Sequence, residues 1–508
     1  MERWTREELE QVLSSKDEQR LSRLHDAIQQ SGWRTKYHVQ SVTGLLSNPC
    51  GFSYFNGQWH LFYEWFPYGS VHGMKHWYHV TSSDLVHWRN QGVSLKPDRS
   101  FDNFGCEGGT AFPKDDFLYM TYTGNSHDDY GKKIPYQGLA AMDSNYRISK
   151  LSRPILEPQL GYTYNQEDPH ILQEKGMYYI LLGAQNEQEE GKILLYRSSQ
   201  IATGWEFLGE LKVKGYGSFG YMCQGPHLQK IGDQWVLIFS PLGLHKKGDT
   251  TSNAFQSVYM IGDMDFETLE FRPNGPYREL DRGFDFFAPQ CAAQSSNQDG
   301  AILEAWMGCN GYTYAPTDQQ GWSGLLTLPR ELTIQNGKLM QKPVIALQQL
   351  KKDIVFEAVN GNIRNNHIFG RTPKSCVIEV DNPADNNMCL NLFTYNRGRG
   401  FEICYSAKDK KLSLDRSEMQ NVINPEYGTS RMINMTNPVR KLQIFVDYSS
   451  VEVFVNDGEF VLSSRVFPNP SEHMIRMSGR DINLRIYTAD SAIQDDFVLF
   501  PVNKEEIK

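Results

Sequence analysis

A hairpin pattern that recurs about every 60 residues constrains the fold more than any other feature of this sequence. Between residues 36 and 340, short aromatic and β-branched runs flank pairs of turn-forming residues, which is typical of β-hairpins. The turns, 57 to 67 residues apart, are centred on the following pairs: Asn56-Gly57, Asp115-Asp116, Lys175-Gly176, Gly232-Asp233 and Asp299-Gly300. Because a lone hairpin sheet cannot bury its own faces, five such units predict a radial array of sheets.

Each hairpin follows a short segment rich in small residues or proline, at a similar offset. In chain order these segments are SNPCGF, CEGGTAF, QEDPHIL, QGPHL and APQCA. The innermost strand of each propeller blade lines the central axis, so these segments are expected to converge on one pocket. We therefore predict a five-bladed β-propeller over residues 36–340; the alternative is an accidental run of hairpins in a sandwich.

The rest of the chain has a different character. Residues 1–35 are charged and predict an N-terminal helical extension with one apolar face, formed by Leu9, Val12, Leu13, Leu21, Leu24 and Ile28. Residues 341–354 predict a linker helix. From residue 355 to 508 alternating strands resume in another rhythm, including a hairpin with an Asn-Asp-Gly turn, and predict a β-sandwich. The predicted fold class is all-β.

Composition narrows the classes of partner. Aromatic residues make up 12% of the chain and there are 42 glycines, which fits a β protein whose clefts stack against flat ligands such as sugars. The net charge of −9 and the absence of a basic run argue against nucleic acid. Without an apolar leader, a long apolar run or a CxxC pair, we expect a cytoplasmic protein with reduced thiols and no membrane contact. No cofactor is predicted, and the oligomeric state stays open.

Several longer motifs carry a family resemblance over nearly the whole chain. They include YHVQSVTGLLSNPCGFSYFNGQWHLFYEWFPYG, HWYHVTSSDLVHW, GYMCQGPHL, FDFFAPQ, GWSGLLTLPREL and FVDYSSVEVFVNDGE. On these motifs the sequence resembles glycoside hydrolase family 32, which includes bacterial sucrose-6-phosphate hydrolases and β-fructofuranosidases. The resemblance implies a five-bladed propeller, a sandwich, and retaining hydrolysis of fructosides by three axial carboxylates: a nucleophile, a transition-state stabiliser and an acid/base.

The chain departs from that family at most of the catalytic positions. Where the family has Asn-Asp-Pro-Asn-Gly, this chain reads Ser-Asn-Pro-Cys-Gly, which puts Asn48 at the nucleophile position. Arg-Asp-Pro becomes Glu-Asp-Pro, so the stabiliser Asp168 persists but Glu167 replaces the cation. Glu-Cys-Pro becomes Gln-Gly-Pro, and Gln224 at the acid/base position cannot donate a proton as a carboxylic acid does. Because the flanking residues have changed too, natural divergence explains the pattern better than an engineered substitution.

The resemblance also implies a set of sugar-contacting positions. These are Ser47, Cys50, Glu64, Trp77, Glu107, Gly108, Glu167 and His227. With Asp168, the set brings four acids to the axis, where acids raise one another's pKa and attract cations. Cys50, Cys223 and His227 add ligand types that suit zinc, but hydrogen-bonded acids without a metal are the more frequent arrangement, and no metal site is assigned.

Three functions stay open at this point. The first is hydrolysis of sucrose or sucrose 6-phosphate. The second is binding of a small carbohydrate without catalysis. The third is a changed glycosidase in which Glu64, Glu107 or Glu167 replaces the lost groups. The missing carboxylates predict that fructoside hydrolysis is lost or strongly impaired.

Two further groups of residues receive weaker expectations. The lysine pairs at 132–133 and 246–247 fit solvated surface pairs better than a phosphate site. Asp447, Ser450 and Glu452, in the predicted sandwich, are assigned no chemistry.

Overall fold

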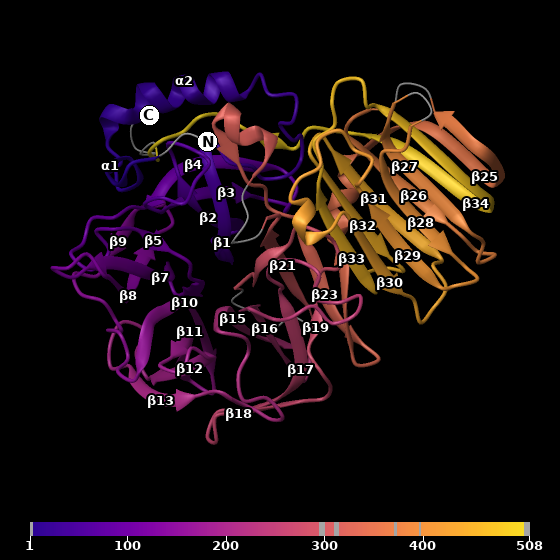
Figure 1. Cartoon of the computed structure of the whole chain (residues 1–508). Helices are drawn as coiled ribbons and strands as arrows, with labels where there is room; N and C mark the ends of the chain where they lie inside the picture. Colours follow the sequence, from indigo (N-terminus) through magenta and orange to yellow (C-terminus); the bar gives the residue numbers. More distant parts are fainter. Residues whose placement is uncertain (1–3, 294–299, 309–313, 370–372, 396–397, 502–508) are drawn as a thin grey trace.

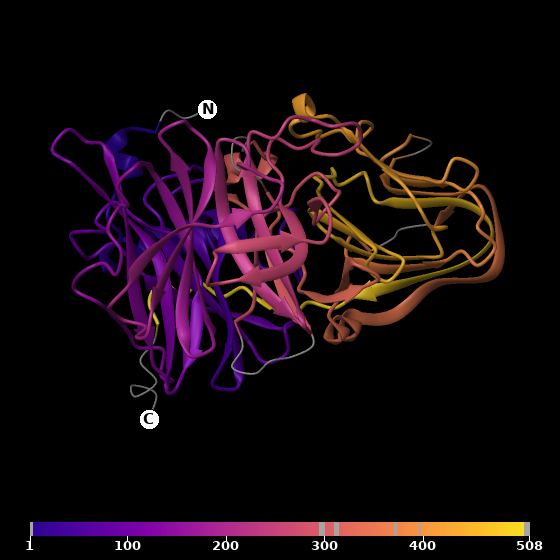
Figure 2. The same ribbon diagram turned by 90° about the horizontal axis from the view of Figure 1, so that it is seen from below.

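The computed structural model describes residues 4–293, 300–308, 314–369, 373–395 and 398–501. The described chain is mostly β, with a propeller-like arrangement of sheets followed by a C-terminal β-sandwich (Figures 1 and 2). Both parts agree with the predicted fold class. Within the described residues, no helix is long and apolar enough to cross a membrane.

The sheets of the propeller-like part are built from strands that follow one another in the sequence and pair mainly antiparallel. The first holds β1 (Gly44–Phe55), β2 (Gln58–Phe66), β3 (His76–Ser82) and β4 (Trp88–Leu95). The second holds β5 (Cys106–Glu107), β6 (Ala111–Lys114), β7 (Phe117–His127), β8 (Lys133–Met142) and β9 (Ile148–Lys150). The third holds β10 (Tyr162–Glu174), β11 (Met177–Asn186), β12 (Gly191–Ser198) and β13 (Glu206–Glu210).

The next sheet holds β14 (Lys212–Val213), β15 (Met222–Ile231), β16 (Gln234–Leu242), β17 (Val258–Asp265), β18 (Glu270–Pro273) and β19 (Arg278–Glu279). A further sheet holds β20 (Phe287–Cys291), β21 (Ala301–Trp306), β23 (Arg330–Gln335) and β24 (Lys338–Pro343). The short β22 (Trp322–Ser323) follows the 3-10 helix η2 (Pro316–Gln320) and pairs in parallel with β1. This pairing joins the end of the propeller-like part to its beginning.

Four of the predicted hairpin turns lie between paired strands, as expected. Each contains a residue with left-handed backbone: Asn56 (φ 48°), Asp115 (φ 52°), Lys175 (φ 48°) and Gly232 (φ 58°). Gly, Asn and Asp tolerate this conformation, which is why their local signal located the turns. Residue 299, in the fifth predicted turn, lies outside the described residues.

The N-terminal extension is not the single helix that the sequence predicts. It comprises α1 (Arg6–Leu9), the 3-10 helix η1 (Ser15–Asp17) and α2 (Glu18–Ile28). The side chain of Thr5 caps α1, and Ser14 with Asp17 forms a second capping box that starts a new helix. Leu21 is buried as predicted, whereas Val12 lies between the helices and is 62% exposed, so its assignment to the apolar face is wrong.

The sandwich follows the 3-10 helix η3 (Ile345–Leu350), which lies where a linker helix is predicted. Its strands are β25 (Lys351–Phe369), β26 (Cys376–Asp381), β27 (Met388–Thr394), β28 (Phe401–Ser406), β29 (Lys411–Asp415), β30 (Ser430–Asn434), β31 (Lys441–Asp447), β32 (Ser450–Val455), β33 (Phe460–Arg465) and β34 (Met474–Ala489), with the 3-10 helix η4 (Pro425–Tyr427) before β30. Cys389 and Cys404 face each other on β27 and β28 and are disulfide-bonded, which corrects the expectation of uniformly reduced thiols.

The end of the chain leaves the sandwich, although the sequence assigns residues 355–508 to it. After β34 the chain runs back to the first sheet, where β35 (Ile493–Gln494) pairs in parallel with β4 (yellow in Figure 1). Beyond β35, the backbone carbonyl of Asp496 accepts from Asn90, and Val93 N donates to Leu499 O at 2.8 Å. These bonds fix the segment against the edge strand of the sheet, which no local sequence pattern reveals.

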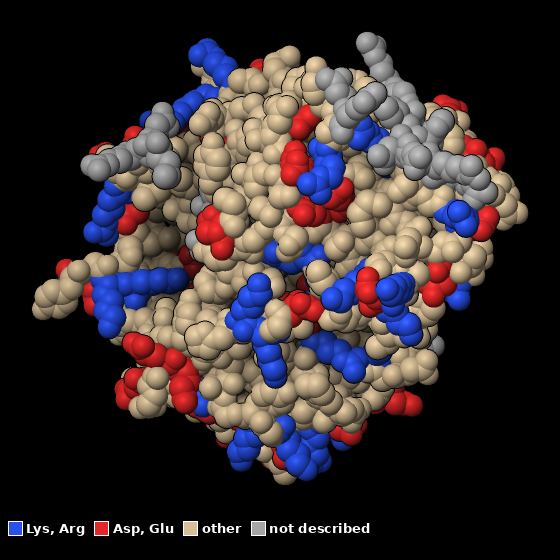
Figure 3. Space-filling view, turned by 45° about the vertical axis from the view of Figure 1, so that its right-hand side comes forward, with Lys and Arg blue, Asp and Glu red and all other residues tan. Residues whose placement is uncertain are grey.

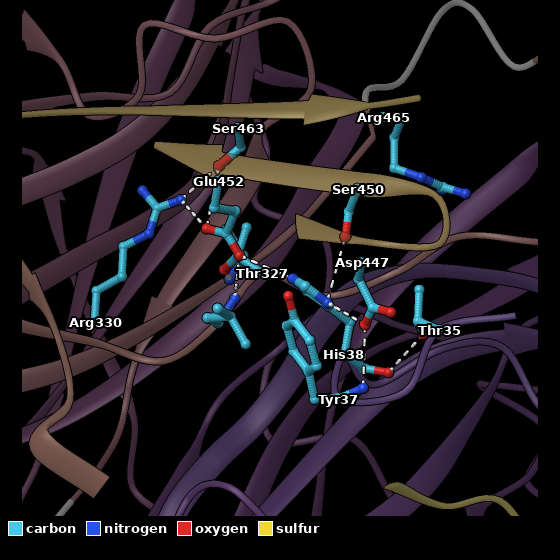
Figure 4. Close-up of polar contacts among 12 residues, drawn as sticks. Thr35, Tyr37, His38, Thr327, Arg330, Asp447, Ser450, Glu452, Ser463 and Arg465 are labelled. Atoms are coloured by element: carbon cyan, nitrogen blue, oxygen red, sulfur yellow. Dashed lines mark hydrogen bonds and ion pairs between the residues drawn. The ribbon is translucent and has the colours of Figure 1, made fainter. Parts of the chain in front are cut away.

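A buried polar network joins the two parts (Figure 4). The His38 ring lies between two sandwich carboxylates, with Nδ1 3.1 Å from Asp447 Oδ2 and Nε2 3.2 Å from Glu452 Oε1. Arg330 of β23 donates to Glu452 Oε2 at 2.9 Å and to Asp281 Oδ2 at 3.0 Å. The residues left without an assigned chemistry in the sandwich therefore serve the interface.

Candidate axial binding site

The inner strands of four sheets break their pairing register at the segments that the sequence singles out. The breaks lie between Leu46 and Pro49, Glu167 and His170, Gln224 and His227, and Phe287 and Gln290. A β-bulge of this kind bends the strand and re-aims a side chain. At three of the bulges the backbone is left-handed, at Asp168 (φ 62°), Gly225 (φ 55°) and Ala288 (φ 49°).

Amides occupy both of the positions at which the family resemblance implies reacting groups. The Asn48 Oδ1 atom is buried and accepts no hydrogen bond from the described residues. Gln224 Nε2 donates to Glu167 Oε1 at 2.5 Å. An amide carries no negative charge and has no acidic proton, so neither group supplies a nucleophile or a general acid.

Asp168 is held in place by the backbone around it. Its Oδ2 accepts from Gly225 N at 2.9 Å, and its own N–H donates to Thr123 Oγ1 at 3.0 Å. A Cβ atom at Gly108 would lie 2.0 Å from Asp168 Oδ1, so only glycine leaves room for this carboxylate. Burial, then the charges of Glu167 and Glu64, raise the pKa of Asp168 well above its ordinary value.

A second carboxylate, Glu64 of β2, belongs to a buried polar chain. Ser47 Oγ donates to Glu64 Oε2 at 2.8 Å, and Lys75 Nζ donates to Ser47 Oγ at 3.0 Å. Burial raises the pKa of Glu64 to about 7, against the opposing charge of Lys75. Burial likewise lowers the pKa of Lys75. The Glu64 carboxyl group therefore titrates near neutral pH.

The third and fourth carboxylates share one lysine. Lys133 Nζ lies 3.0 Å from Glu107 Oε2 and 3.8 Å from Glu167 Oε2. Burial opposes ionisation of Glu107, but the charge of Lys133 and the hydrogen bonds of Asn125 and Lys133 outweigh it, and the pKa of Glu107 is lowered. The Lys133 side chain is 40% exposed, in keeping with the expected solvated pair, but it also pairs with these acids, while Lys132 lies 4.6 Å from the centre of the Tyr164 ring.

Three of the implied sugar-contacting residues lie away from the acids or beneath them. Trp77 is fully buried and its Nε1 donates to Glu107 O at 2.9 Å, so it supports that strand and offers no face to a ligand. Cys50 is fully buried, and its Sγ donates to Asn48 O at 3.4 Å. The His227 ring packs against the His170 ring in a tilted arrangement, with centroids 3.8 Å apart and planes inclined by 35°.

The metal hypothesis gains no support from the described side chains. The group of His, Cys, Asp and Glu found there with ligand atoms within 4.8 Å of one another is Cys389, Glu402 and Cys404, in the sandwich. Its two cysteines are bonded to each other. Neither Cys223 nor His227 joins the axial acids in such a group.

Sequence reasoning missed Lys75, which supplies the buried positive charge of the site. It lies just before β3, and its carbonyl accepts from Cys106 N at 2.9 Å, which ties it to the strand that carries Glu107. A buried lysine needs a compensating charge. The one available signal was its position two residues before Trp77, directly before β3.

Known proteins share this architecture. The model of the glycosyl hydrolases family 32 N-terminal domain matches residues 38–343, and that of the family 32 C terminal matches residues 346–487. A sucrose-6-phosphate hydrolase of Staphylococcus xylosus is 36% identical over 94% of this chain and 96% of its own length. The structure of a sucrose-6-phosphate hydrolase from Lactobacillus gasseri is 32% identical, with a TM-score of 0.90 over 96% of this chain and all of that one.

A more distant solved structure is a Bombyx mori β-fructofuranosidase variant in complex with sucrose. It is 27% identical, with a TM-score of 0.82, and the alignment covers 95% of this chain and 100% of that chain. The two family models together span most of the residues from the start of β1 to the end of the sandwich. The chain therefore belongs to glycoside hydrolase family 32.

Proposed function

We propose that this chain binds a sucrose-type glycoside at the axial site and that its hydrolysis of fructosides is lost or strongly impaired. The observation that carries the proposal is the pair of amides at the reacting positions: Asn48, with a free buried acceptor, and Gln224, bonded to Glu167. Amides keep hydrogen-bonding capacity for sugar hydroxyls while removing the charge and the proton that the chemistry needs.

The size of the loss follows from how catalytic groups cooperate. In a set of residues that act as a unit, removing one principal member lowers the rate by roughly 10⁴ to 10⁶. Asn48 and Gln224 replace two such members. Turnover of a fructoside by the family mechanism is therefore expected to fall by at least about 10⁴ relative to an intact relative.

The experiment compares binding with turnover on the same sugars. Sucrose and sucrose 6-phosphate are titrated by calorimetry into the protein, and their hydrolysis is assayed beside the Staphylococcus xylosus relative. We expect heat of binding without comparable turnover, and a gain of hydrolysis in the Asn48→Asp/Gln224→Glu variant but not in either single variant. Turnover at the relative's rate refutes the catalytic half of the proposal, and absence of any binding refutes the other half.

A second candidate function is a changed glycosidase with relocated acids. It is favoured by the opposite pKa shifts of two axial carboxylates: Glu64 is raised to about 7, mainly by burial, while Lys133 holds that of Glu107 low despite burial. A general acid and a general base require two groups whose pKa values differ in this way. A panel of aryl glycosides tests it: release of the aryl group that Glu64→Gln and Glu107→Gln both abolish supports this function, and release that survives both changes excludes these two acids.

For the architecture, we propose that the sheets β1–β4, β5–β9, β10–β13, β14–β19 and β20, β21, β23, β24 are five blades of one propeller. The parallel pairing of β22 with β1 supports ring closure. We also propose the boundaries 1–35 for the helical extension, 36–343 for the propeller, 344–350 for the linker and 351–489 for the sandwich, which keep β24 and β25 whole where the boundaries predicted at 340 and 355 divide them. The sandwich range also ends earlier than the sequence predicts because β35 pairs with β4.

A further inference from the structure

A separate cavity of about 350 Å³ lies along the inner strands, beyond the axial acids. Its deep wall includes Thr110, His170 and His227, and the hairpin-turn residues Gly232 and Gly300 lie at its edge. None of the axial carboxylates lines it. The cavity is therefore distinct from the site proposed above, although its walls continue the same strands.

Hydrogen bonds between neighbouring inner strands lie between the axial acids and the cavity. Gln290 Nε2 donates to Gly109 O at 3.1 Å, and Thr110 Oγ1 donates to Pro169 O at 3.2 Å. Pro169 separates Asp168, on the acidic side, from His170, on the cavity side. The chain thus places two chemically different surfaces on consecutive residues of one bulged strand.

The two histidines in the cavity wall each have a buried nitrogen without a partner among the described residues. His170 Nε2 lies 3.2 Å from the carbonyl of Leu228, so this nitrogen is the donor and the unpartnered Nδ1 is left as an acceptor. His227 Nε2 is also buried and unpartnered. The exposed fractions are 6% for His170 and 4% for His227.

The electrostatics keep both rings neutral. Burial lowers the pKa of His170 to about 4, and burial together with the neighbouring His170 lowers that of His227 well below 6.5. Two adjacent imidazoles with centroids 3.8 Å apart would repel each other if both were charged. At neutral pH the two histidines therefore present uncharged hydrogen-bonding nitrogens, and the charged side chains of the lining are the half-buried Glu174 and the exposed Lys230 and Asp233.

A buried acceptor that stays unpaired costs free energy, roughly 1–3 kcal/mol, so these nitrogens call for a hydroxyl or N–H donor. The remaining lining includes the apolar Ile171 and Leu228 and the aromatic Trp235, with the charged Glu174, Lys230 and Asp233 in its more exposed part. A volume of 350 Å³ falls at the lower end of the range for small-molecule sites, about 300–1,000 Å³. A neutral ligand with several hydroxyl groups satisfies all these features.

We propose that this cavity is a second, non-catalytic site for a neutral polyhydroxylated molecule of mono- or disaccharide size, with hydroxyl groups bonded to His170 and His227. This proposal goes beyond the axial function and does not depend on it. The two sites differ in charge: the axial site is rich in carboxylates and ammonium groups, whereas the histidine cavity is neutral at depth.

The test is crystallographic and calorimetric, with glucose, fructose and sucrose as the probes. Crystals of the full chain soaked in each sugar are expected to show one of these sugars between His170 and His227, and titration is expected to show a binding event that His227→Phe removes. Phenylalanine keeps an aromatic ring beside His170 but removes the nitrogen. His227→Asn, which restores a polar group, is expected to recover part of the affinity.

The control is His473→Phe, a substitution far from the cavity on the sandwich, which should leave binding unchanged. Equal thermal unfolding of the variants shows that the fold is retained. Water alone at both histidines in every soaked crystal, or binding that persists in His227→Phe, overturns the proposal. Stoichiometric zinc on the two histidines would overturn it as well, because the cavity would then be a metal site.

Discussion

The absence of a side chain at Gly108 determines how the carboxylates at the axis are arranged. The space that its side chain would fill is taken by the Asp168 carboxylate, and Glu64 Oε1 lies 3.6 Å from the same point. Asp168 in turn keeps its position through one backbone donor, Gly225 N. The acids therefore pack closely together because Gly108 has no Cβ atom.

Gly108→Ala is expected to abolish or weaken sucrose binding at the axis by about tenfold or more, equivalent to roughly 1.4 kcal/mol. The new methyl group would meet Asp168 Oδ1 at 2.0 Å, so the carboxylate must rotate away from Gly225. Calorimetric titration measures the change. Gly275→Ala is the matched control, since a Cβ there meets nothing within 4 Å. Unchanged affinity in Gly108→Ala would show that Asp168 does not contact the sugar.

The axial carboxylates also predict how sugar binding responds to pH. The pKa of Glu64 is raised to about 7, first by burial. The protonated carboxyl donates as well as accepts a hydrogen bond, whereas the ionised one only accepts. Sucrose affinity is therefore expected to change across about pH 7 in the native chain and to lose that step in Glu64→Gln, as followed by titration at several pH values. A step that persists in Glu64→Gln would assign the pH dependence to another group.

At the scale of elements, the sequence predicts turns that depend on neighbouring residues. It misses contacts between residues that lie far apart in the chain. The turns at Asn56-Gly57 and Gly232-Asp233 were predictable because left-handed residues carry their own signal. Lys75 and Lys133 were not, because their partners lie on other strands. The amides at Asn48 and Gln224 stood out only against the family motifs, and their contacts with neighbouring groups required the structure.

The returning C-terminal segment is the element that local patterns could not place, and Asp495 within it binds the N-terminal extension. Asp495 pairs with Arg34, accepts from Gln29 and Gln40, and its backbone carbonyl lies 2.9 Å from His25 Nε2. The Arg34 side chain is 7% exposed, so removing its partner leaves a charge buried. The segment thus fastens α2 to the first sheet.

Asp495→Ala is expected to lower the free energy of unfolding by about 3 kcal/mol, the cost of breaking a buried ion pair. Asp496→Ala is the matched control, because this neighbouring carboxylate is exposed and accepts a hydrogen bond from Gln494. Chemical denaturation followed by fluorescence compares the two. Equal stability of both variants would mean that the segment contributes no more than its backbone pairing.

On the scale of the whole molecule, the propeller-like part and the sandwich form one unit through a shared core. A single cluster of buried side chains includes Leu45 and Trp65 from the first sheet and Phe445 and Phe454 from the sandwich. Over the face drawn in Figure 3, Lys and Arg alternate with Asp and Glu in small groups, so no basic field marks this face for nucleic acid. The charged residues that join the two parts are instead buried between them: His38, Arg330, Asp447 and Glu452.

His38 makes that junction sensitive to pH. Both of its ring nitrogens contact carboxylates, Asp447 and Glu452, and both contacts are satisfied when the ring is protonated (Figure 4). Burial opposes the charge, but the hydrogen bonds to the two acids prevail and raise the pKa of His38 above 6.5. Among the described residues, Tyr37, Cys376, Glu304 and Arg330 are further ionisable groups that face this cluster.

Because folding raises the pKa of His38, the direction in which stability changes with pH is fixed. The stability contributed by His38 is fully present below the unfolded value near 6.5 and is lost as pH rises through the higher folded value. Thermal unfolding is therefore expected to move to lower temperature with increasing pH above 6.5, and His38→Gln should remove this dependence.

The glutamine variant should also be less stable by about 3 kcal/mol below pH 6.5, because Asp447 and Glu452 lose their shared cation. His87→Gln is the control, since that ring is half exposed and pairs with Asp84 at the surface. A pH profile shared by the native chain and His38→Gln would show that the ring is neutral in the folded protein, and that the two carboxylates are balanced by Arg330 and by backbone donors alone.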